Sequence, residues 1–518
     1  MRLMPESAPR VPGTVAVPGT RAGWSSLHLA LAVVVALTLL RIGALALTGL
    51  ELHGDEAQYW SWAQHFSFGY YTKPPLIAWI IGATTAVCGD GEACVRLSSP
   101  LLHGATAMGL YALGRVLGGS RNGPRVGMWA ALLWITLPAV AFSSIIVSTD
   151  VPLLACWTAA VLALRLTLDK GRQGRWGWAA ATGVAIGLGL LAKYAMVYFA
   201  LGLALHMAAE PRDRWLLRDR RALLILGLAL AVLLPNLAWN AGHDFATVQH
   251  LRANADLQGR PPSPLPMLEF LGQQLGVFGP IPFLVLLWRA VAWARGRASV
   301  AERYLLAYAL PPLAVVTVQA FLSRAHANWA VAAYPTAAVL VALWLTEAGR
   351  SRAWRAWTIG PHLAVGVLAL LLVAVSPDLV PSRLAPTVAR LSGWDAAARE
   401  LRPVLDRNPG LPVLTTDRMT MASLLYALRD RLREGDREPA DTRTPTWIWD
   451  WNGRPENQYE IFDAFEPGPG AAAVLVTDWA DPSPVLSQFS SVEKVADLSA
   501  LRPGGNRTLT VWKVSNRR

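Results

Sequence analysis

The chain has 518 residues, of which 53% are hydrophobic and only 16% are charged, and its mean hydropathy is +0.33. Soluble globular domains carry about 25% charged residues, so this composition excludes an ordinary soluble protein. The net charge of +12 is explained by loop charges that set membrane topology and by contact with anionic lipids. We therefore expect membrane lipids, and no nucleic acid, among the partners of the chain.

About eleven apolar blocks follow one another up to residue 376. Each approaches the roughly 20 residues that a helix needs to cross about 30 Å of hydrocarbon. The sequence therefore predicts a polytopic α-helical membrane protein with about 11 transmembrane helices. The predicted spans are 24–48, 97–117, 125–147, 151–168, 176–191, 194–209, 221–239, 267–295, 302–322, 327–348 and 356–376.

The charges between these blocks predict the orientation of the chain. Arginine and lysine are concentrated in alternate loops, which by the positive-inside rule lie in the cytoplasm. This rule places the tail 1–23, which we expect to be disordered, in the cytoplasm, and the segment 377–518 outside. The membrane domain is then 24–376. The loops expected outside are poor in cations and hold Glu51, Asp55, Glu56, Asp90 and Glu92.

The first outer loop, 51–96, carries the most informative pattern. Asp55 and Glu56 stand where the chain leaves the first span, and Lys73 immediately precedes a Pro-Pro pair. Carboxylates at a membrane rim are costly unless they have a function. The spacing of aromatic and apolar residues predicts an interfacial helix over 55–66 and a second juxtamembrane helix over 74–88.

Three acids are candidates for catalysis. Asp55 and Glu56 are suited to remove a proton from an acceptor, and Asp150 lies at the outer end of two spans. The alternative for each is helix capping, because an acid near a helix N-terminus satisfies free backbone N–H groups. Capping explains one acid of the Asp55–Glu56 pair but not both.

Several outward-facing side chains could bind a phosphate or the donor. Lys73 is the first candidate phosphate ligand, with snorkelling at the interface as the alternative. Tyr70 belongs to an aromatic belt beside it. Lys193 follows a short apolar segment, where snorkelling is the favoured interpretation. Arg324 and His326 share the same side of the membrane.

Histidine and cysteine give weaker signals. His243 is a weak candidate metal ligand in the outer loop 240–266. Cys88 and Cys94 flank a Gly-containing gap on the side where disulfides are permitted, so they either form a disulfide or remain unpaired. Cys156 lies inside a span, where it packs as a small apolar residue.

The composition becomes soluble after residue 376. The pattern predicts helices over 394–406 and 419–429 and strands over 412–415, 445–449, 472–477 and 507–514. This order favours a small extracytoplasmic α/β domain. We find no internal repeat of the kind that many secondary transporters carry.

Short motifs at the ends of the predicted spans form a recognisable set. They are His53–Trp60, Gly69–Leu76, Val95–Leu97, Thr149–Leu153, Ala192–Tyr194, Pro235–Asn240 and Ala327–Trp329. In this set the chain resembles the lipid-phosphate-sugar-dependent glycosyltransferases of the GT-C superfamily. More narrowly it resembles family 39, the protein O-mannosyltransferases and aminoarabinose (lipid A) transferases, over residues 45–375.

The resemblance implies roles for three residues. Asp55 matches the catalytic or acceptor-positioning acid, Asp150 the second acid, and Lys73 the phosphate-contacting lysine. Some members carry a glutamate, a candidate metal ligand, before that lysine, where this chain has Thr72. A divalent metal ion is therefore a candidate cofactor only. The predicted spans are also fewer than in better-known members.

The sequence and the resemblance together predict an inverting glycosyltransferase of a bacterial inner membrane. It would move a monosaccharide, hexosyl or pentosyl, from a polyprenyl-phosphate donor, undecaprenyl phosphate by preference, to a periplasmic acceptor. That acceptor is lipid A, another glycan or a protein. A transporter or flippase of lipid-linked sugars is the alternative, and it predicts ionisable residues in mid-membrane and a repeat between halves.

Overall fold

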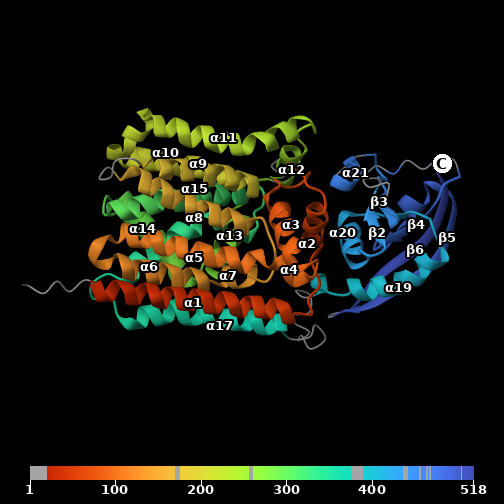
Figure 1. The fold of residues 1–518 in the computed structure, drawn as a ribbon, viewed down its shortest axis with the longest axis horizontal. Coiled ribbons are helices and arrows are strands. Elements are labelled where there is room, and N and C mark those ends of the chain that lie inside the picture. Colours follow the sequence, from red (N-terminus) through yellow and green to blue (C-terminus); the bar gives the residue numbers. More distant parts are fainter. Residues whose placement is uncertain are drawn as a thin grey trace, which may run out of the picture.

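A computed structural model gives the fold of the chain. It describes residues 20–169, 175–255, 261–374, 389–435, 441–453, 457–462, 465, 468, 470–502 and 505–517. A bundle of long helices forms one part of the molecule and a C-terminal sheet domain the other, with a layer of short helices between them (Figure 1). We call the bundle end that faces the C-terminal domain the domain end.

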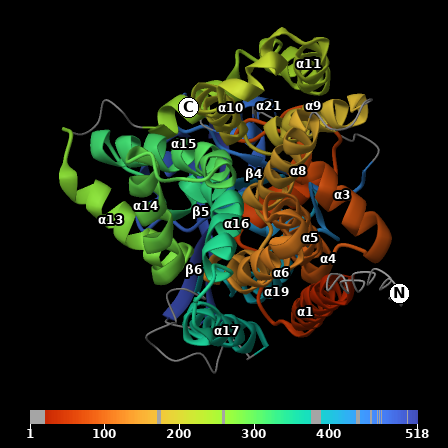
Figure 2. The same ribbon diagram turned by 90° about the vertical axis from the view of Figure 1, so that its left-hand side faces the viewer.

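The bundle helices run roughly along the longest axis of the molecule (Figure 1). In the end-on view, α16 lies at the centre and α11 at the periphery (Figure 2). The elements are α1 (Thr20–Leu47), α5 (Ser98–Leu117), α6 (Gly119–Thr136), α7 (Pro138–Ser143), α8 (Asp150–Leu168), α9 (Trp176–Ala192), η1 (Tyr194–Val197), α10 (Tyr198–Ala209), η2 (Pro211–Arg218), α11 (Arg220–Ala241), α13 (Pro264–Val277), α14 (Pro280–Ala294), α15 (Val300–Leu322), η3 (Ala327–Ala333), α16 (Tyr334–Leu345) and α17 (Arg352–Ala374).

Burial separates the central helix from the peripheral ones. Almost every residue of α16 is buried, so this helix forms the middle of the apolar core. In contrast, only 11% of the most apolar window of α11 is buried, and leucines such as Leu223, Leu226 and Leu230 are exposed. A helix that exposes an apolar surface of this size is suited to contact lipid chains.

Five helical segments within the described ranges are long and apolar enough to cross a membrane by length and composition. They are Ser25–Leu47, Asp150–Leu168, Arg220–Ala241, Val300–Leu322 and Ala327–Leu345. The pair α13 and α14 passes the same test jointly, which brings the number to at most six. Each of the eleven predicted spans overlaps helix, the last two residues of the span 356–376 lie outside the described residues, and the number of crossings stays a prediction.

Two predicted spans are interrupted in the structure. The segment 125–147 consists of α6 and α7, separated at Leu137, and its helix ends at Ser143. The segment 267–295 is two helices, α13 and α14, whose axes are bent by 119°. The break contains Gly279, whose φ of 91° favours glycine, and two prolines follow within α14. Because proline has no backbone N–H to donate, it cannot continue the hydrogen bonding of a preceding helix, and the Gly-Pro sequence interrupts the span.

The layer of short helices is built from the loops at the domain end. It contains α2 (Gly54–Ala63), α3 (Leu76–Cys88), α4 (Glu92–Arg96) and α12 (Ala246–Ala255). The helices predicted over 55–66 and 74–88 correspond to α2 and α3. A disulfide joins Cys88, at the end of α3, to Cys94 in α4.

The C-terminal domain contains one mixed sheet with strand order β2-β3-β1-β4-β6-β5. The first four strands in this order are parallel, and β6 pairs antiparallel with both β4 and β5. The elements are η5 (Ala389–Leu391), α19 (Trp394–Arg407), β1 (Val413–Thr415), α20 (Arg418–Ala427), β2 (Leu432–Glu434), β3 (Thr444–Ile448), α21 (Gln458–Phe462), β4 (Ala472–Thr477), α22 (Ser483–Leu486), β5 (Phe489–Arg502) and β6 (Gly505–Arg517).

The short helices and the C-terminal domain share one apolar core. It includes Trp62 of α2 and Ile77 of α3 together with Leu401, Leu424 and Val474 from the C-terminal domain. Burial of apolar surface is the main stabilising contribution to such a contact. The domain is therefore packed firmly onto the helix layer, and α20 faces α2.

Candidate active site

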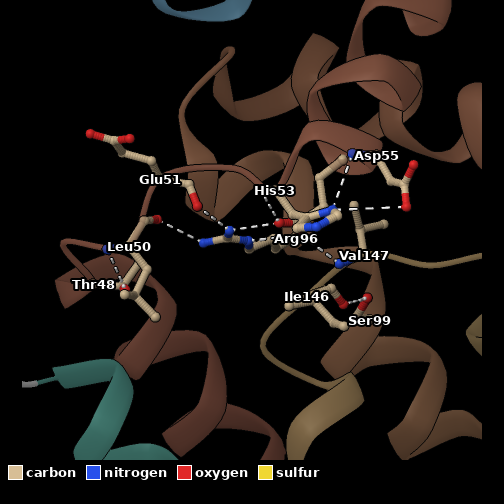
Figure 3. A network of polar contacts seen from close by, with 10 residues as sticks. Thr48, Leu50, Glu51, His53, Asp55, Arg96, Ser99, Ile146 and Val147 are labelled. Carbon is tan, nitrogen blue, oxygen red and sulfur yellow. Dashed lines mark hydrogen bonds and ion pairs between the residues drawn. The ribbon is translucent and has the colours of Figure 1, made fainter. Parts of the chain in front are cut away.

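A buried ion pair fixes the chain at the start of α2 (Figure 3). Arg96 donates to both carboxylate oxygens of Glu56, at 2.9 and 2.7 Å, and its remaining N–H groups donate to the carbonyls of Leu50 and Glu51 at 2.9 and 2.8 Å. The two charged side chains are only 1% and 3% exposed. This arrangement anchors the end of the first span to α4.

Glu56 has further bonds that complete its surroundings. One oxygen accepts from the backbone N–H of His53 at 2.9 Å, which forms a capping box at the start of α2. The other accepts from the N–H of Val147 at 2.8 Å. Of the two adjacent acids, Glu56 is therefore the one that caps α2. Both oxygens of its buried carboxylate accept hydrogen bonds from protein groups.

Asp55, in contrast, is 44% exposed and pairs with the C-terminal domain. One of its oxygens accepts from Arg418 of α20 at 2.8 Å, and the same guanidinium nitrogen donates to Gln58 at 2.8 Å. Burial alone would raise the pKa of Asp55, but Arg418, with smaller contributions from His53 and Lys73, holds it below its ordinary value. Asp55 is therefore ionised at neutral pH.

Asp150 is the first residue of α8 and connects three elements of the bundle. Its two oxygens accept from Lys193 Nζ, at the end of α9, and from the amide of Asn328, in η3, both at 2.7 Å. The residue before it, Thr149, is the N-cap, and no side chain makes a capping bond there. Asp150 therefore binds neighbouring side chains instead of capping α8, and Lys193 is its ion-pair partner.

Lys73 lies in the segment between α2 and α3 and is half-buried. Burial and the nearby Lys193 lower its pKa, while Asp55 and Asp150 oppose this shift. Within the described ranges Lys73 forms no ion pair. Its ammonium group thus stands among the two acids and Lys193 without a carboxylate partner of its own, which leaves it able to bind an anion.

The remaining predicted residues differ in their burial and contacts. Tyr70 is buried, its hydroxyl donates to the carbonyls of Trp62 and His65, and its ring stacks on Trp62. Arg324 is half-buried, and His326 is exposed with its ring against Trp329. Asn328 connects this last segment to Asp150.

No set of metal ligands is evident in the described part of the chain. His243 stacks on Trp239 and its Nδ1 lies 2.7 Å from the carbonyl of that residue. The described residues contain no group of three or more His, Cys, Asp or Glu side chains that could hold a metal ion. The donor set around His243 therefore does not fit a protein-bound metal.

Sequence reasoning did not assign the partners of these acids. Arg96 and Asn328 lie in motifs noted above, so a search for the partner of each acid within those motifs could have found them. His250 of α12 is another neighbour, since Lys73, Arg418 and Asp55 influence its pKa, which burial lowers to about 4. Arg418 stands in no motif, and no sequence signal points to it.

Comparison with known proteins identifies the family. Residues 72–239 match the model of the dolichyl-phosphate-mannose-protein mannosyltransferase family. Over 503 residues the chain is 33% identical to lipid A galacturonosyltransferase RgtD of Rhizobium johnstonii, covering 94% of this chain and 98% of that protein. The chain belongs to the family 39 glycosyltransferases of the GT-C superfamily.

Solved structures agree with this fold. ArnT from Cupriavidus metallidurans, in the apo state and bound to undecaprenyl phosphate, matches with a TM-score of 0.59 at 16% identity. The match covers 95% of this chain and 98% of ArnT. The chain is thus a polytopic GT-C membrane protein with a C-terminal sheet domain, and its family membership makes it a glycosyltransferase.

Proposed function

We propose that the chain is an inverting enzyme that moves one monosaccharide from a polyprenyl phosphate to a hydroxyl group of a periplasmic acceptor. The observation that carries the proposal is the group formed by Asp55, Lys73, Asp150 and Lys193 at the domain end of the bundle. It combines an ionised carboxylate with an ammonium group that has no carboxylate partner among the described residues. Glycosyl transfer from a lipid phosphate needs both.

In the proposed step, the acceptor oxygen attacks the anomeric carbon from the face opposite the phosphate. A bond from that carbon to the acceptor oxygen forms while its bond to the phosphate oxygen breaks, and the electron pair leaves with the polyprenyl phosphate. The hydroxyl proton passes to Asp55. Because Arg418 lowers the pKa of Asp55, this transfer occurs late, once the attacking oxygen has become acidic.

The cations and Asp150 bind and orient the substrates in the proposed step. Lys73 stabilises the charge that develops on the departing phosphate, and Arg324 and His326 assist from the segment that precedes η3. Asp150, held by Lys193 and Asn328, orients the donor or acceptor hydroxyl groups. Fixed orientation of this kind removes part of the entropic barrier to reaction.

We propose an undecaprenyl-phosphate donor that carries galacturonic acid and lipid A as acceptor. The match to RgtD, named for galacturonosyl transfer to lipid A, and the fold shared with ArnT, solved with undecaprenyl phosphate, support this choice. The charges support it too, because Lys73, Lys193 and Arg418 outnumber the two acids. A donor with both a phosphate and a sugar carboxylate is suited to such a site.

We further propose a bacterial inner-membrane location with the domain end in the periplasm. Arginines concentrate at the opposite end, for example Arg214 after α10, Arg289 in α14 and Arg303 in α15. Short cytoplasmic loops are enriched in such residues. The tail 1–23 is then cytoplasmic, and the domain 377–518 lies beside the acceptor.

The test uses the full-length protein in liposomes with labelled undecaprenyl-phosphate galacturonic acid and lipid A. We expect transfer of label and release of undecaprenyl phosphate. Asp55→Asn and Lys73→Ala should each lower the rate at least about a hundredfold. The matched controls are Asp430→Asn and Lys494→Ala, whose side chains pair with Arg402 and Asp497 on the surface of the C-terminal domain.

Full activity of Asp55→Asn would contradict the assignment of the base. Label that crosses the bilayer without release of undecaprenyl phosphate would contradict transferase chemistry in favour of a flippase. Transfer from a donor with a neutral sugar, and none from the galacturonic acid donor, would overturn the choice of sugar only.

A further inference from the structure

We propose that Arg418 is a positioning residue through which the C-terminal domain completes the active site. It holds the Asp55 carboxylate in its ionised form and in the direction of the acceptor. The inference rests on the proposed role of Asp55 as the base. It extends that role, since it makes a residue of the sheet domain necessary for chemistry at the rim of the helix bundle.

The contact between the two domains at this point is direct. Arg418 Nη1 lies 2.8 Å from Asp55 Oδ1 and 2.8 Å from Gln58 Oε1. The arginine side chain is 36% exposed and the aspartate 44%, so the pair lies at an opening where a substrate can reach it. An ion pair kept only for stability gains little in such a place.

The helix that carries Arg418 is seated by its own N-terminal contacts. Arg418 is the first residue of α20, and the preceding Asp417 caps the helix by accepting from the N–H groups of Met419 and Thr420 at 2.8 and 3.0 Å. Met419 packs against Gly54, where an added Cβ would lie 2.6 Å from the methionine Cε. The arginine is thereby fixed close to the residue before Asp55.

The other end of α20 is also held by the helix layer. The ring of Tyr426 packs edge-on against Trp60 at 5.0 Å between centroids, and its hydroxyl donates to the carbonyl of Asp90 at 2.7 Å. Trp60 donates in turn to the Asp90 side chain at 2.7 Å. With both ends of α20 attached to the layer that contains α2, Arg418 has little freedom to leave Asp55.

The charges around Asp55 determine what Arg418 contributes. Burial raises the pKa of this carboxyl, and Arg418 is the strongest opposing influence, ahead of His53 and Lys73. His250 of α12 and Tyr59 of α2 also face the group. Burial is the largest single influence on this pKa even with Arg418 present, so without Arg418 the pKa of Asp55 would rise.

The experiment compares two variants of the full-length enzyme in liposomes over the range from about pH 5 to about pH 8, which lies above the ordinary Asp pKa of about 3.9. Arg418→Gln removes the charge and Arg418→Lys keeps it. The matched control is Arg402→Gln in the same domain. Arg402 forms an exposed pair with Asp430 at 2.7 and 2.8 Å, beyond the end of α20 opposite to Arg418.

We expect the loss of kcat/KM in Arg418→Gln to be at least about tenfold larger at the acid end than at the alkaline end of this range. The loss is larger at low pH because Asp55 acts as a base only when it is ionised. A raised pKa leaves more Asp55 protonated at low pH, and raising the pH restores the ionised form. Arg418→Lys should retain the wild-type pH profile at a reduced rate, and Arg402→Gln should match wild type throughout.

A loss in Arg418→Gln that is equal at every pH would overturn the inference, because a merely structural role lowers the amount of active enzyme without moving the profile. Wild-type activity of the same variant would overturn it as well. Asp55→Asn separates the two proposals. If it is inactive while Arg418→Gln shows no pH effect, only the positioning role fails; if it is fully active, the proposed base fails too.

Discussion

Asp55 and Glu56 are neighbours in the chain, yet each forms a different kind of ion pair. The Glu56–Arg96 pair is almost fully buried, and backbone groups satisfy its remaining hydrogen-bonding positions. The Asp55–Arg418 pair is more than one-third exposed on both sides and joins two domains. Two adjacent acids at the start of one helix can therefore have different roles. Glu56 faces the protein interior and stabilises the structure, whereas Asp55 faces the C-terminal domain and remains accessible.

The largest expected effect comes from removing the buried cation. Arg96→Ala leaves Glu56 as a buried charge without its partner, which should lower the free energy of unfolding by about 3–5 kcal/mol. Thermal unfolding of the detergent-solubilised protein measures this. A variant as stable as wild type would show that water or another cation replaces Arg96, and the distinction between the pairs would not hold.

Identical chemical changes at the two acids give a second test. Glu56→Gln should destabilise the protein by about 3 kcal/mol while the folded fraction keeps its turnover. Asp55→Asn should leave unfolding nearly unchanged and abolish turnover. Measuring stability and specific activity on the same preparations checks both, and the reverse assignment of effects would refute the division of roles.

An intermediate effect is expected where the two domains touch. Gly54→Ala places a methyl group against Met419, and overpacking of this kind costs about 1–3 kcal/mol. Because Met419 follows Arg418, activity should fall with stability. Shortening the methionine in Gly54→Ala/Met419→Ala should restore part of the activity, and no restoration would mean that the contact does not control Arg418.

The smallest effect is expected for an arginine on the domain surface. Arg402→Ala breaks an exposed pair with Asp430 and should change the free energy of unfolding by at most about 1 kcal/mol. Its activity should equal that of wild type. A loss comparable to that of Arg96→Ala would show that burial is not what distinguishes the pairs.

Local pattern was sufficient to predict much of this molecule. The span expected over 151–168 corresponds to α8, and the strand expected over 472–477 coincides with β4, because uninterrupted apolar runs identify buried elements. Strand β5 was not predicted, since its sequence includes charged residues such as Glu493 and Lys494 that suit an edge strand.

The candidate site could be predicted only in part. Asp55, Lys73 and Asp150 stand in motifs at the rim of the membrane, where charged residues are unusual, so composition points to them. Their partners depend on tertiary contacts: Arg96 is 40 residues from Glu56, and Arg418 is 363 residues from Asp55. No local pattern encodes such pairings.

The apolar core shared by the helix layer and the C-terminal domain has a consequence for biogenesis. While the chain is being synthesised, α2 and α3 emerge before the C-terminal residues that bury Trp62 and Ile77. The sheet is complete only when β6, the last strand, has paired with β4. The site that we propose therefore needs both parts of the chain, because Arg418 and part of this core come from the C-terminal domain. Under the proposed function, a chain truncated before this domain would occupy the membrane without consuming the lipid-linked sugar, so turnover would report on synthesis of the whole protein.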